Sequence, residues 1–356
     1  MTRQDAPGSR IGSGTVVARA PGRVNLIGEH TDTTLGRCLP IAIDRAVVVS
    51  YTPDESSGAV VLTSDTEADP VTVGLDVEAP ASFEPAWGRY VAGVVQQVRP
   101  RVGGVGHVTS TLPAGVGLSS SAALEVACAL ALGADAGDPV ALARLCQAAE
   151  HAARGVPTGL LDQLASIAGV AGHAVLLDCR ALSFEPVPLP PDDELEIVVV
   201  PGGARSLEHS GYADRLADLH RAEAEIGPLR DASLAAVDGI EDGTVRRRAR
   251  HVVAENARVL DLALCLASGD VAAAGAIVSA SHRSLRDDYE CSLPRIDDLC
   301  AQLDRTPGVL GSRILGAGWG GAVLALTRPG ALTGPGAPHV ADAVWPVRAS
   351  AGAAVA

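Results

Sequence analysis

The chain has 356 residues, of which 47% are hydrophobic and 20% charged, which predicts about two folded domains and excludes an extended disordered chain. Its formal net charge of −14 disfavours binding to nucleic acids, and we expect no nucleic-acid partner. All 28 basic residues are arginine, which excludes a P-loop nucleotide site, a Schiff-base enzyme and the protein-kinase fold, because each of these needs a lysine.

The first hundred residues are expected to be mainly β-structure. Short runs rich in β-branched residues predict strands at 15–19, 46–51, 58–63, 71–77 and 106–112. Between the first two runs, the polar stretch from Arg23 to Asp32 is interpreted as a loop. Farther along, small residues predict helices over 119–132 and 139–153, and an apolar run predicts a strand at 173–177.

A proline-rich stretch at 186–191 is interpreted as a hinge, followed by a strand at 196–200. It divides the chain into predicted domains 1–188 and 189–356, of which the last strand can return to the N-terminal domain. The second half is expected to be mostly helical, with amphipathic helices at 213–225, 245–267 and 296–303. Its remaining predicted elements are strands at 313–315, 322–327 and 343–347 and a Gly/Pro-rich loop at 329–338.

The seven cysteines are dispersed and include no C-x-x-C pair, so we interpret them as reduced thiols that mostly fill the core. Residues 1–17 contain no apolar stretch of the signal-peptide type. No run approaches the ~20 apolar residues of a membrane span. These features predict a cytoplasmic protein without a membrane partner, and the absence of a heptad pattern predicts a monomer.

Glycines and serines directly precede a predicted helix in the segment LPAGVGLSSSAA at 112–123. Backbone N–H groups at the start of a helix attract anions, and small residues let a phosphate approach closely. Serine hydroxyls can add donors or bind Mg²⁺. Because serines also cap ordinary helices, the segment alone leaves open both a phosphate site without lysine and a plain helix cap.

Ionisable groups gather in the segment RAPGRVNLIGEHTD at 19–32, which contains Arg23, Glu29, His30 and Asp32. A sugar pocket uses carboxylates and imidazole to bind vicinal hydroxyls, and an arginine to stabilise developing negative charge. An ordinary solvated loop could carry the same groups, so both interpretations stay open for this segment by itself.

The segment GAGWGG at 316–321 matches the dinucleotide pattern G-x-G-x-x-G. A Rossmann site is nevertheless excluded, because strand-like residues and not a helix follow the glycines. A second glycine-rich turn that lies against nucleotide phosphates is the more consistent interpretation. A plain tight turn between two strands remains the alternative.

Jointly, these three segments resemble the GHMP small-molecule kinases, and among them the galactokinases. PGRVNLIGEHTD at 21–32 is similar to the galactokinase signature, and the segments at 112–127 and 316–321 are similar to the second and third family motifs. AAEHAARGVPTGLLDQLAS at 148–166 and SHRSLRDDYECS at 281–292 are also galactokinase-like. The resemblance implies an α+β fold with a mixed β/α nucleotide-binding N-terminal domain, of the ribosomal-protein-S5-domain-2-like type, and a ferredoxin-like C-terminal domain.

The resemblance also implies an ATP-dependent sugar kinase that phosphorylates the C1 hydroxyl of galactose or a galactose-like sugar. Asp162 would be the base or electrostatic partner for that hydroxyl, beside Arg23. The residues implied to bind the sugar are Glu29, His30, Asp32, Gly159 and Tyr212. The residues implied to bind ATP are Gly115, Gly117, Leu118, Ser119, Ser120, Ser121 and Gly318. The implied Mg²⁺ ligands are Ser121 and Glu150.

One departure from the family pattern concerns the substrate. Thr33 and Thr34 stand where galactokinases usually carry Tyr-Asn, so a more open pocket could admit a modified or longer sugar such as an octose. A kinase for a non-sugar alcohol such as mevalonate or homoserine is a second alternative, which the GEHTD segment disfavours. A catalytically silent sensor of galactose and ATP is a third.

Overall fold

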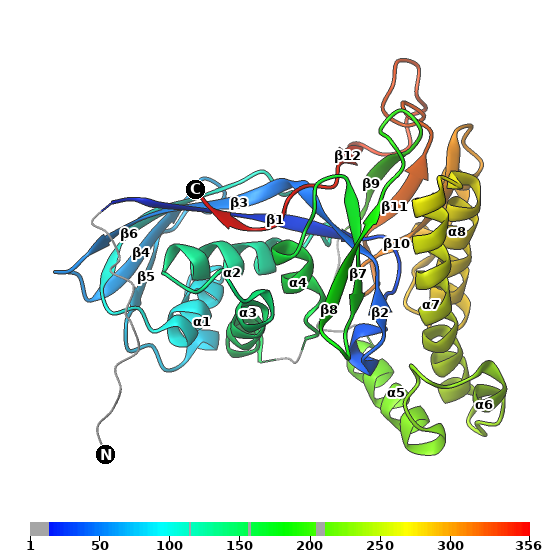
Figure 1. The fold of residues 1–356 in the computed structure, drawn as a ribbon, viewed down its shortest axis with the longest axis horizontal. Coiled ribbons are helices and arrows are strands. Elements are labelled where there is room, and N and C mark those ends of the chain that lie inside the picture. The colour runs from blue at the N-terminus through cyan, green and yellow to red at the C-terminus, as the bar shows by residue number, and fades with distance from the viewer. Residues whose placement is uncertain (1–13, 114, 156–157, 204–210) are drawn as a thin grey trace.

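The computed structural model describes residues 14–113, 115–155, 158–203 and 211–356. One large sheet with its helices occupies each half of the molecule, and a small sheet lies between the two halves (Figure 1). Helices and strands are mixed throughout, which confirms the α+β fold. Among the described residues, no helix combines the length and the apolar run that crossing a membrane requires.

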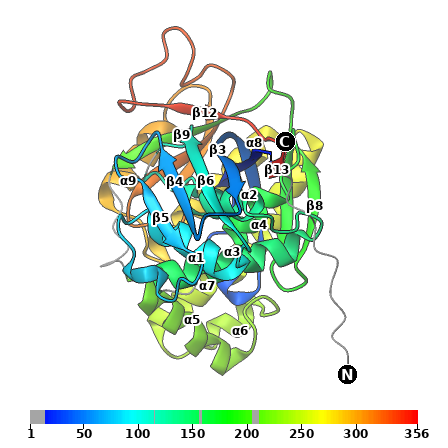
Figure 2. The same cartoon turned by 90° about the vertical axis from the view of Figure 1, so that its left-hand side faces the viewer.

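The first sheet has the strand order β13-β1-β3-β6-β4-β5 and is antiparallel except for the pair of β4 and β6. Its strands are β1 (Val16–Asn25), β3 (Pro40–Asp54), β4 (Ala59–Ser64), β5 (Val71–Gly74), β6 (Gly103–Ser110) and β13 (Ala354–Val355). Four helices lie on one face of this sheet in both views (Figures 1 and 2). They are α1 (Gly88–Val98), α2 (Ser120–Ala131), α3 (Pro139–Arg154) and α4 (Leu161–Ile167). Two short 3-10 helices also occur: η1 (Asp32–Thr34) between β1 and β2, and η2 (Pro80–Ser82) between β5 and α1.

The second sheet is antiparallel and has the order β10-β11-β9-β12, the arrangement of a ferredoxin-like domain. Its strands are β9 (Glu196–Gly203), β10 (Val309–Leu315), β11 (Gly321–Thr327) and β12 (Trp345–Val347). The helices of this half are α5 (Tyr212–Ile226), α6 (Leu234–Asp238), α7 (Gly243–Ser268), α8 (Val271–Asp287) and α9 (Pro294–Asp304). Buried Val, Leu and Ala residues of both sheets form the main cores, as expected for a sequence with 3% aromatic residues.

A third, small sheet lies between the two halves (Figure 1). It contains β2 (Arg37–Cys38), β7 (His173–Asp178) and β8 (Ser183–Pro188), in that order. The chain then enters the second sheet at β9, and its last strand β13 pairs with β1 of the first sheet. The division into domains 1–188 and 189–356 remains our proposal. All seven cysteines are free thiols, and all but Cys265 are buried.

The structure differs from the sequence-based expectations in several places, and α4, α6 and β8 are among the elements that were not predicted. Arg23 lies on a strand and not in a loop, because β1 continues past a register shift to Asn25. Helix α1 forms in the region expected to be β-rich, where burial of one face outweighs the low helix propensity of its Gly and Val residues. Residues 271–287, for which no element was predicted, form α8. The proline-rich stretch 186–191 begins as the end of β8, an edge strand that tolerates proline.

Helix α7 holds the segment 25–37, which carries β1 into β2. The buried Glu255 accepts a hydrogen bond from the Gly28 N–H at 3.1 Å. Asn256 Oδ1 accepts a hydrogen bond from the Arg37 N–H at 2.8 Å. These contacts join residues more than 200 positions apart, so the second half of the chain fixes the backbone of a segment that belongs to the first.

The fold predicts that Glu255 stabilises the protein in a pH-dependent way. Burial alone raises the pKa of Glu255, but the nearby His251, Arg258 and Arg313 lower it to about 2, from an ordinary value of 4.5. A carboxylate with a lowered pKa contributes stability that is complete above its ordinary pKa and disappears as the pH falls toward the lowered one. The shift corresponds to about 3 kcal/mol. We therefore expect Glu255→Gln to lower the free energy of unfolding at neutral pH by about 3 kcal/mol, as measured by denaturant titration.

The same titration at a series of acidic pH values provides the control. The free energy of unfolding of the unmodified chain should fall as the pH drops from 4.5 to about 2, the ordinary and the lowered pKa of Glu255. The Glu255→Gln variant should lose less stability over the same pH range. Asp261→Asn, which removes an exposed carboxylate from the same helix, should leave the profile unchanged. Parallel profiles for the unmodified chain and Glu255→Gln would contradict the assignment.

Candidate active site

Arg23 on β1 and Asp162 in the first turn of α4 form an ion pair. Arg23 Nη2 lies 2.6 Å and Nε 2.9 Å from Asp162 Oδ1. The Arg23 side chain is 8% exposed and that of Asp162 is 33% exposed, so the carboxylate is the accessible member of the pair. The two residues predicted to carry the chemistry, 139 positions apart in the chain, are therefore neighbours.

The loop that precedes α2 packs against this pair. The Ser119 hydroxyl donates a hydrogen bond to Asp162 Oδ2. Arg23 Nη1 donates to the Gly117 carbonyl at 2.6 Å, and the Arg23 N–H donates to the Leu118 carbonyl at 3.1 Å. The predicted phosphate loop and the predicted catalytic pair thus form one cluster.

The start of α2 has features that suit an anion. Ser119 precedes the helix with a φ of 55°, and its side chain makes no capping hydrogen bond to the helix but donates to Asp162. Gly115 and Gly117 also have positive φ values, of 73° and 79°, which glycine adopts at low cost. Uncapped N–H groups at a helix start, next to the serines at 120–121, are a favourable place for a phosphate group.

Asp32 and Gly159 make a contact that requires glycine. A Cβ atom at position 159 would lie 1.9 Å from Asp32 Oδ2. Burial, together with the negative charges of Asp162 and Glu29, raises the pKa of Asp32 to about 6. The structure therefore brings Asp32 and Gly159, both predicted to bind the sugar, into contact, and the charge of Asp162 is close enough to affect Asp32.

Glu29 is held by the second sheet. Its Oε1 atom accepts hydrogen bonds from Arg313 Nη2 at 3.0 Å and from the Gly316 N–H at 2.8 Å, and both side chains of the ion pair are buried. Burial raises the pKa of Glu29, but Arg313, Arg23 and His30 lower it overall. Glu29 is thus an ionised carboxylate with one oxygen fixed by the protein, which leaves Oε2 for the predicted sugar contact.

Aromatic rings surround His30. Its ring stacks on Tyr289 at 4.1 Å between centroids, and the rings of Tyr212 and Trp319 lie 6.1 and 6.5 Å away. His30 has a φ of 64°, a left-handed conformation that a residue with a side chain adopts at a cost, so the surrounding packing must hold it. His251 Nε2 lies 3.2 Å from the carbonyl oxygen of the residue that precedes His30. Two predicted sugar-binding residues, His30 and Tyr212, are therefore close together.

Glu150 on α3 is the carboxylate predicted to bind Mg²⁺ together with Ser121. Its Oε2 accepts hydrogen bonds from Thr158 Oγ1 at 2.8 Å and Gln163 Nε2 at 3.0 Å, and its Oε1 accepts one from Arg154 at 3.2 Å. A carboxylate and a hydroxyl offer the oxygen ligands that Mg²⁺ prefers, so the residues fit this ion chemically. Within the described ranges, no group of three or more His, Cys, Asp and Glu side chains gathers at a metal-binding distance.

The glycine-rich turn at 316–321 is fixed against two segments. Its Gly316 N–H contacts Glu29, and the Trp319 N–H donates to the Cys291 carbonyl at 2.7 Å. Gly318 has a φ of 96°, and a Cβ atom there would lie 2.5 Å from the same carbonyl. These contacts place the turn beside the segment 25–37, whereas the contact of Gly318 with ATP stays a prediction.

Sequence reasoning assigned no role to Arg313 or Tyr289, which support the site. Both side chains are fully buried. An arginine inside the apolar run VLGSRIL is a sign of a buried charge that needs a carboxylate partner, and this sign could have identified Arg313. Tyr289 lies in the galactokinase-like segment at 281–292, but no spacing in the sequence indicates that it stacks on His30.

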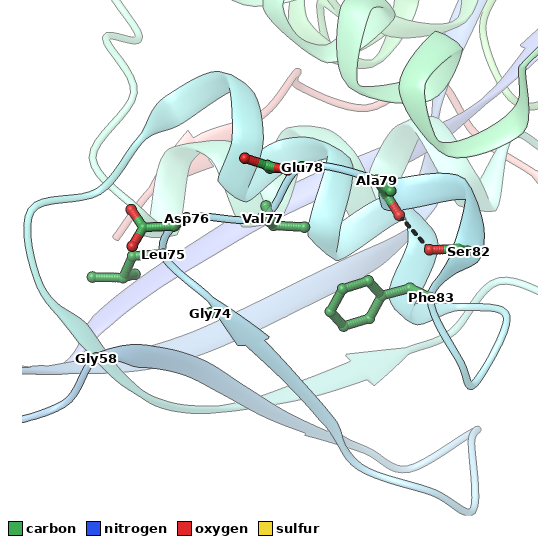
Figure 3. Close-up of a pocket in the computed structure, with 9 residues that line it drawn as sticks. All are labelled: Gly58, Gly74, Leu75, Asp76, Val77, Glu78, Ala79, Ser82 and Phe83. Carbon is green, nitrogen blue, oxygen red and sulfur yellow. Dashed lines mark hydrogen bonds between the residues drawn. The ribbon is translucent and has the colours of Figure 1, made fainter.

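A hollow of about 390 Å³ lies elsewhere, at the end of the first sheet beyond β5 and η2 (Figure 3). Leu75, Val77 and Phe83 line it together with the carboxylates of Asp76 and Glu78. None of the predicted site residues borders this hollow. We therefore assign the candidate active site to the cluster around Arg23 and Asp162.

Three family models match the chain. The galactokinase galactose-binding signature matches residues 8–53. The GHMP kinases N terminal domain matches residues 89–170, and the GHMP kinases C terminal domain matches residues 262–332. The matched regions contain the segment 25–37, the loop before α2, Asp162 and the turn at 316–321, that is, the parts that form the cluster.

Galactokinases from other organisms are similar to this chain over most of its length. The galactokinase of Mycobacterium tuberculosis is 44% identical over 326 residues, which span 88% of this chain and 89% of the relative. The galactokinase of Homo sapiens is 40% identical over 336 residues, which span 90% of this chain and 84% of the relative.

Solved structures support the same grouping. The Lactococcus lactis galactokinase complexed with galactose superposes with a TM-score of 0.85 at 28% identity, over 96% of this chain and 95% of that one. The Methanococcus jannaschii mevalonate kinase superposes with a TM-score of 0.66 at 17% identity, over 96% of this chain and 100% of that one, and shows a likeness of fold alone. The chain therefore belongs to the galactokinases, within the GHMP kinase family.

Proposed function

We propose that the chain is an ATP-dependent galactose kinase, which transfers the γ-phosphoryl group of ATP to the C1 hydroxyl of galactose. The observation that supports this most is the contact of the Arg23–Asp162 pair with Ser119 of the loop before α2. It joins an anion-binding helix start to an accessible carboxylate, which is what a phosphoryl transfer to a hydroxyl requires.

Phosphoryl transfer depends on positioning and charge neutralisation more than on covalent help. The C1 hydroxyl binds at the accessible side of Asp162, which orients it and accepts its proton. The new O–P bond forms as the bond between the γ-phosphorus and the β–γ bridging oxygen breaks, and ADP leaves. Arg23, fixed by its hydrogen bond to the Gly117 carbonyl, stabilises the negative charge that develops between the hydroxyl oxygen and the transferred group.

The nucleotide is bound by the loop at 115–121. Its uncapped N–H groups, that of Ser119 included, and the hydroxyls of Ser120 and Ser121 donate hydrogen bonds to the phosphate oxygens. Since the chain has no lysine, Arg23, the helix dipole and a metal ion supply the positive potential. Ser121 and Glu150 hold Mg²⁺, which neutralises phosphate charge when it is bound.

The sugar lies between both halves of the chain. Asp32 and the Oε2 atom of Glu29 accept hydrogen bonds from sugar hydroxyls, and His30 and Tyr212 border the ring. Gly159 leaves the space that Asp32 occupies. A cytoplasmic, monomeric enzyme is part of the proposal, and the seven free cysteines agree with a reducing compartment.

The alternatives from the sequence are less well supported. The relatives at 40–44% identity are galactokinases, which favours galactose over a longer sugar or a non-sugar alcohol. The Arg23–Asp162 pair and the serine loop are assembled, which does not favour a silent sensor. At the departure from the family pattern, Thr34 Oγ1 donates to the Thr31 carbonyl at 3.0 Å, so this hydroxyl is used inside the protein.

Replacing the Asp162 carboxylate by an amide tests the catalytic assignment. We expect Asp162→Asn to lower kcat by roughly 10²-fold or more, because the amide cannot accept the hydroxyl proton. ADP release with Mg-ATP and galactose measures kcat. Calorimetric titration with ATP should give an affinity close to that of the unmodified chain, since the loop at 115–121 is retained.

Asp298→Asn is the matched control, because it removes an exposed carboxylate of α9 that contacts neither Arg23 nor the segment 25–37. This variant should keep its kcat. Normal turnover by Asp162→Asn would refute the role of Asp162, and loss of ATP binding by the same variant would show that its effect is not on the chemical step.

The raised pKa of Asp32 predicts a pH-dependent KM. The group has a pKa of about 6 in the free protein, so below pH 6 it loses the charge that strengthens hydrogen bonds from sugar hydroxyls. We expect KM for galactose to rise as the pH falls through 6, with a smaller change in kcat. Initial rates at a series of pH values, with saturating ATP, measure both.

The Asp32→Asn variant separates binding from stability. A carboxylate with a raised pKa destabilises the folded state at neutral pH, and this cost is relieved as the pH falls, so the amide should raise the melting temperature at pH 7. It should also raise KM above pH 6, where the unmodified carboxylate is charged, and remove the step near pH 6. A variant that keeps the step would show that another group is responsible.

Substrate choice at Thr33 and Thr34 can be measured directly. If the pocket has the usual galactokinase selectivity, kcat/KM for galactose should exceed that for C6-extended sugars by orders of magnitude. Comparable values for both would favour the longer-sugar alternative. Arabinose, which lacks C6, serves as the control for contacts at that end of the sugar.

A further inference from the structure

A cavity of about 640 Å³ lies where the chain passes between the two larger sheets. Two connecting segments border it: 189–195, which leads from β8 to β9, and 346–349, which covers the end of β12 and the residues that follow it. Asp44 and Arg45 of β3, Gly172, and Glu196 and Ile197 of β9 complete the lining, and no predicted site residue contributes to it. The volume is in the range of small-molecule sites in proteins.

Arg45 is the unusual residue of this cavity. It is half-buried, its Nε atom is buried without a hydrogen-bond partner, and its guanidinium makes no ion pair with any described residue. The other arginine of the lining, Arg348, pairs with Asp192 at 3.0 Å. A partly buried guanidinium with unused donors is unfavourable unless an acceptor binds to it.

The charges around Arg45 limit what that acceptor can be. Asp44, Asp192 and Glu196 also line the cavity, and Glu196 accepts hydrogen bonds from the Thr333 hydroxyl at 2.9 Å. Asp192 pairs with Arg348, and Asp44 and Glu196 accept hydrogen bonds from the Arg348 N–H and the Thr333 hydroxyl, so Arg45 is the charged side chain of this lining to which the described residues offer no partner. The three carboxylates repel a dianion such as a phosphate monoester more strongly than a monoanion. A ligand with one negative charge matches the single unpaired arginine.

The remaining walls are apolar. They consist of side chains without polar atoms, many of them buried: Leu189, Pro190, Pro191, Leu195, Ile197, Pro346 and Val347. The prolines offer no N–H donor, so these walls favour a ligand with an apolar body beside its charged group. Charge and lining together describe a small organic acid with one carboxylate and a hydrocarbon body.

We propose that this cavity is a second ligand site, which binds a small monocarboxylate through Arg45. The carboxylate accepts hydrogen bonds from the guanidinium, and the hydrocarbon body packs against the prolines and aliphatic side chains of the two connecting segments. The ligand would contact both halves of the chain. This inference does not depend on the proposed function.

Calorimetric titration of the full chain with hexanoate tests the site. We expect hexanoate to bind, and its neutral analogue hexanamide to bind at least about tenfold more weakly, because the amide lacks the charge that pairs with Arg45. Arg45→Gln should weaken hexanoate binding by a similar factor. Arg101→Gln, which removes an exposed arginine outside the cavity, should leave it unchanged.

Several outcomes would overturn the proposal: no binding of hexanoate, equal binding of hexanoate and hexanamide, or equal hexanoate binding by the unmodified chain and Arg45→Gln. If Arg45→Gln does not fold, Arg45→Lys, which retains the charge, should bind hexanoate well, and the comparison with hexanamide uses the unmodified chain. Inorganic phosphate should bind more weakly than hexanoate, and tighter phosphate binding would refute the charge argument.

Discussion

The buried ion pair between Glu29 and Arg313 is the interaction on which the arrangement of the site depends. Arg313 also donates to the carbonyls of Asn25, Leu26 and Ile314, so its guanidinium is well supplied with acceptors. A buried ion pair is tolerated only with such complete hydrogen bonding, because desolvation of both charges is costly. The segment 25–37 can therefore adopt its conformation only against the second sheet, and the active site requires both halves of the chain.

The end of β1 and the segment 25–37 that follows it connect the proposed phosphate-binding and sugar-binding parts of the site. Arg23 at the end of β1 contacts Asp162 and the phosphate loop, and Glu29 six positions later contacts β10 and the turn at 316–321. Between them, α7 fixes the Gly28 N–H through Glu255. Small changes in how the halves pack would thus move sugar-binding groups relative to the phosphate loop, which explains why so many buried polar contacts fix this one segment.

The sequence predicted those parts of the structure that depend on local pattern. Helix α3 begins at Pro139 after the cap Asp138 and was predicted to within one residue, because cap, proline and apolar spacing agree. The adjacency of Arg23 and Asp162 followed only from the resemblance, since local patterns do not pair distant residues. Glu29 and Arg313 are 284 positions apart, so their pairing could not be predicted. The arginine within an apolar strand did, however, indicate a buried charge.

Two carboxylates of the site pair with an arginine and a third does not, and this difference favours a neutral ligand with many hydroxyls. Glu29 has Arg313 as its partner, and its pKa is lowered overall although burial raises it. Asp162 is paired with Arg23. Asp32 makes no ion pair with any described arginine, and burial together with Asp162 and Glu29 raises its pKa to about 6. A carboxylate left without a cation is stabilised by ligands that donate hydrogen bonds, and sugar hydroxyls donate them without adding charge. At the proposed sugar site these carboxylates would therefore favour an uncharged polyol over an anionic alcohol, which they would repel.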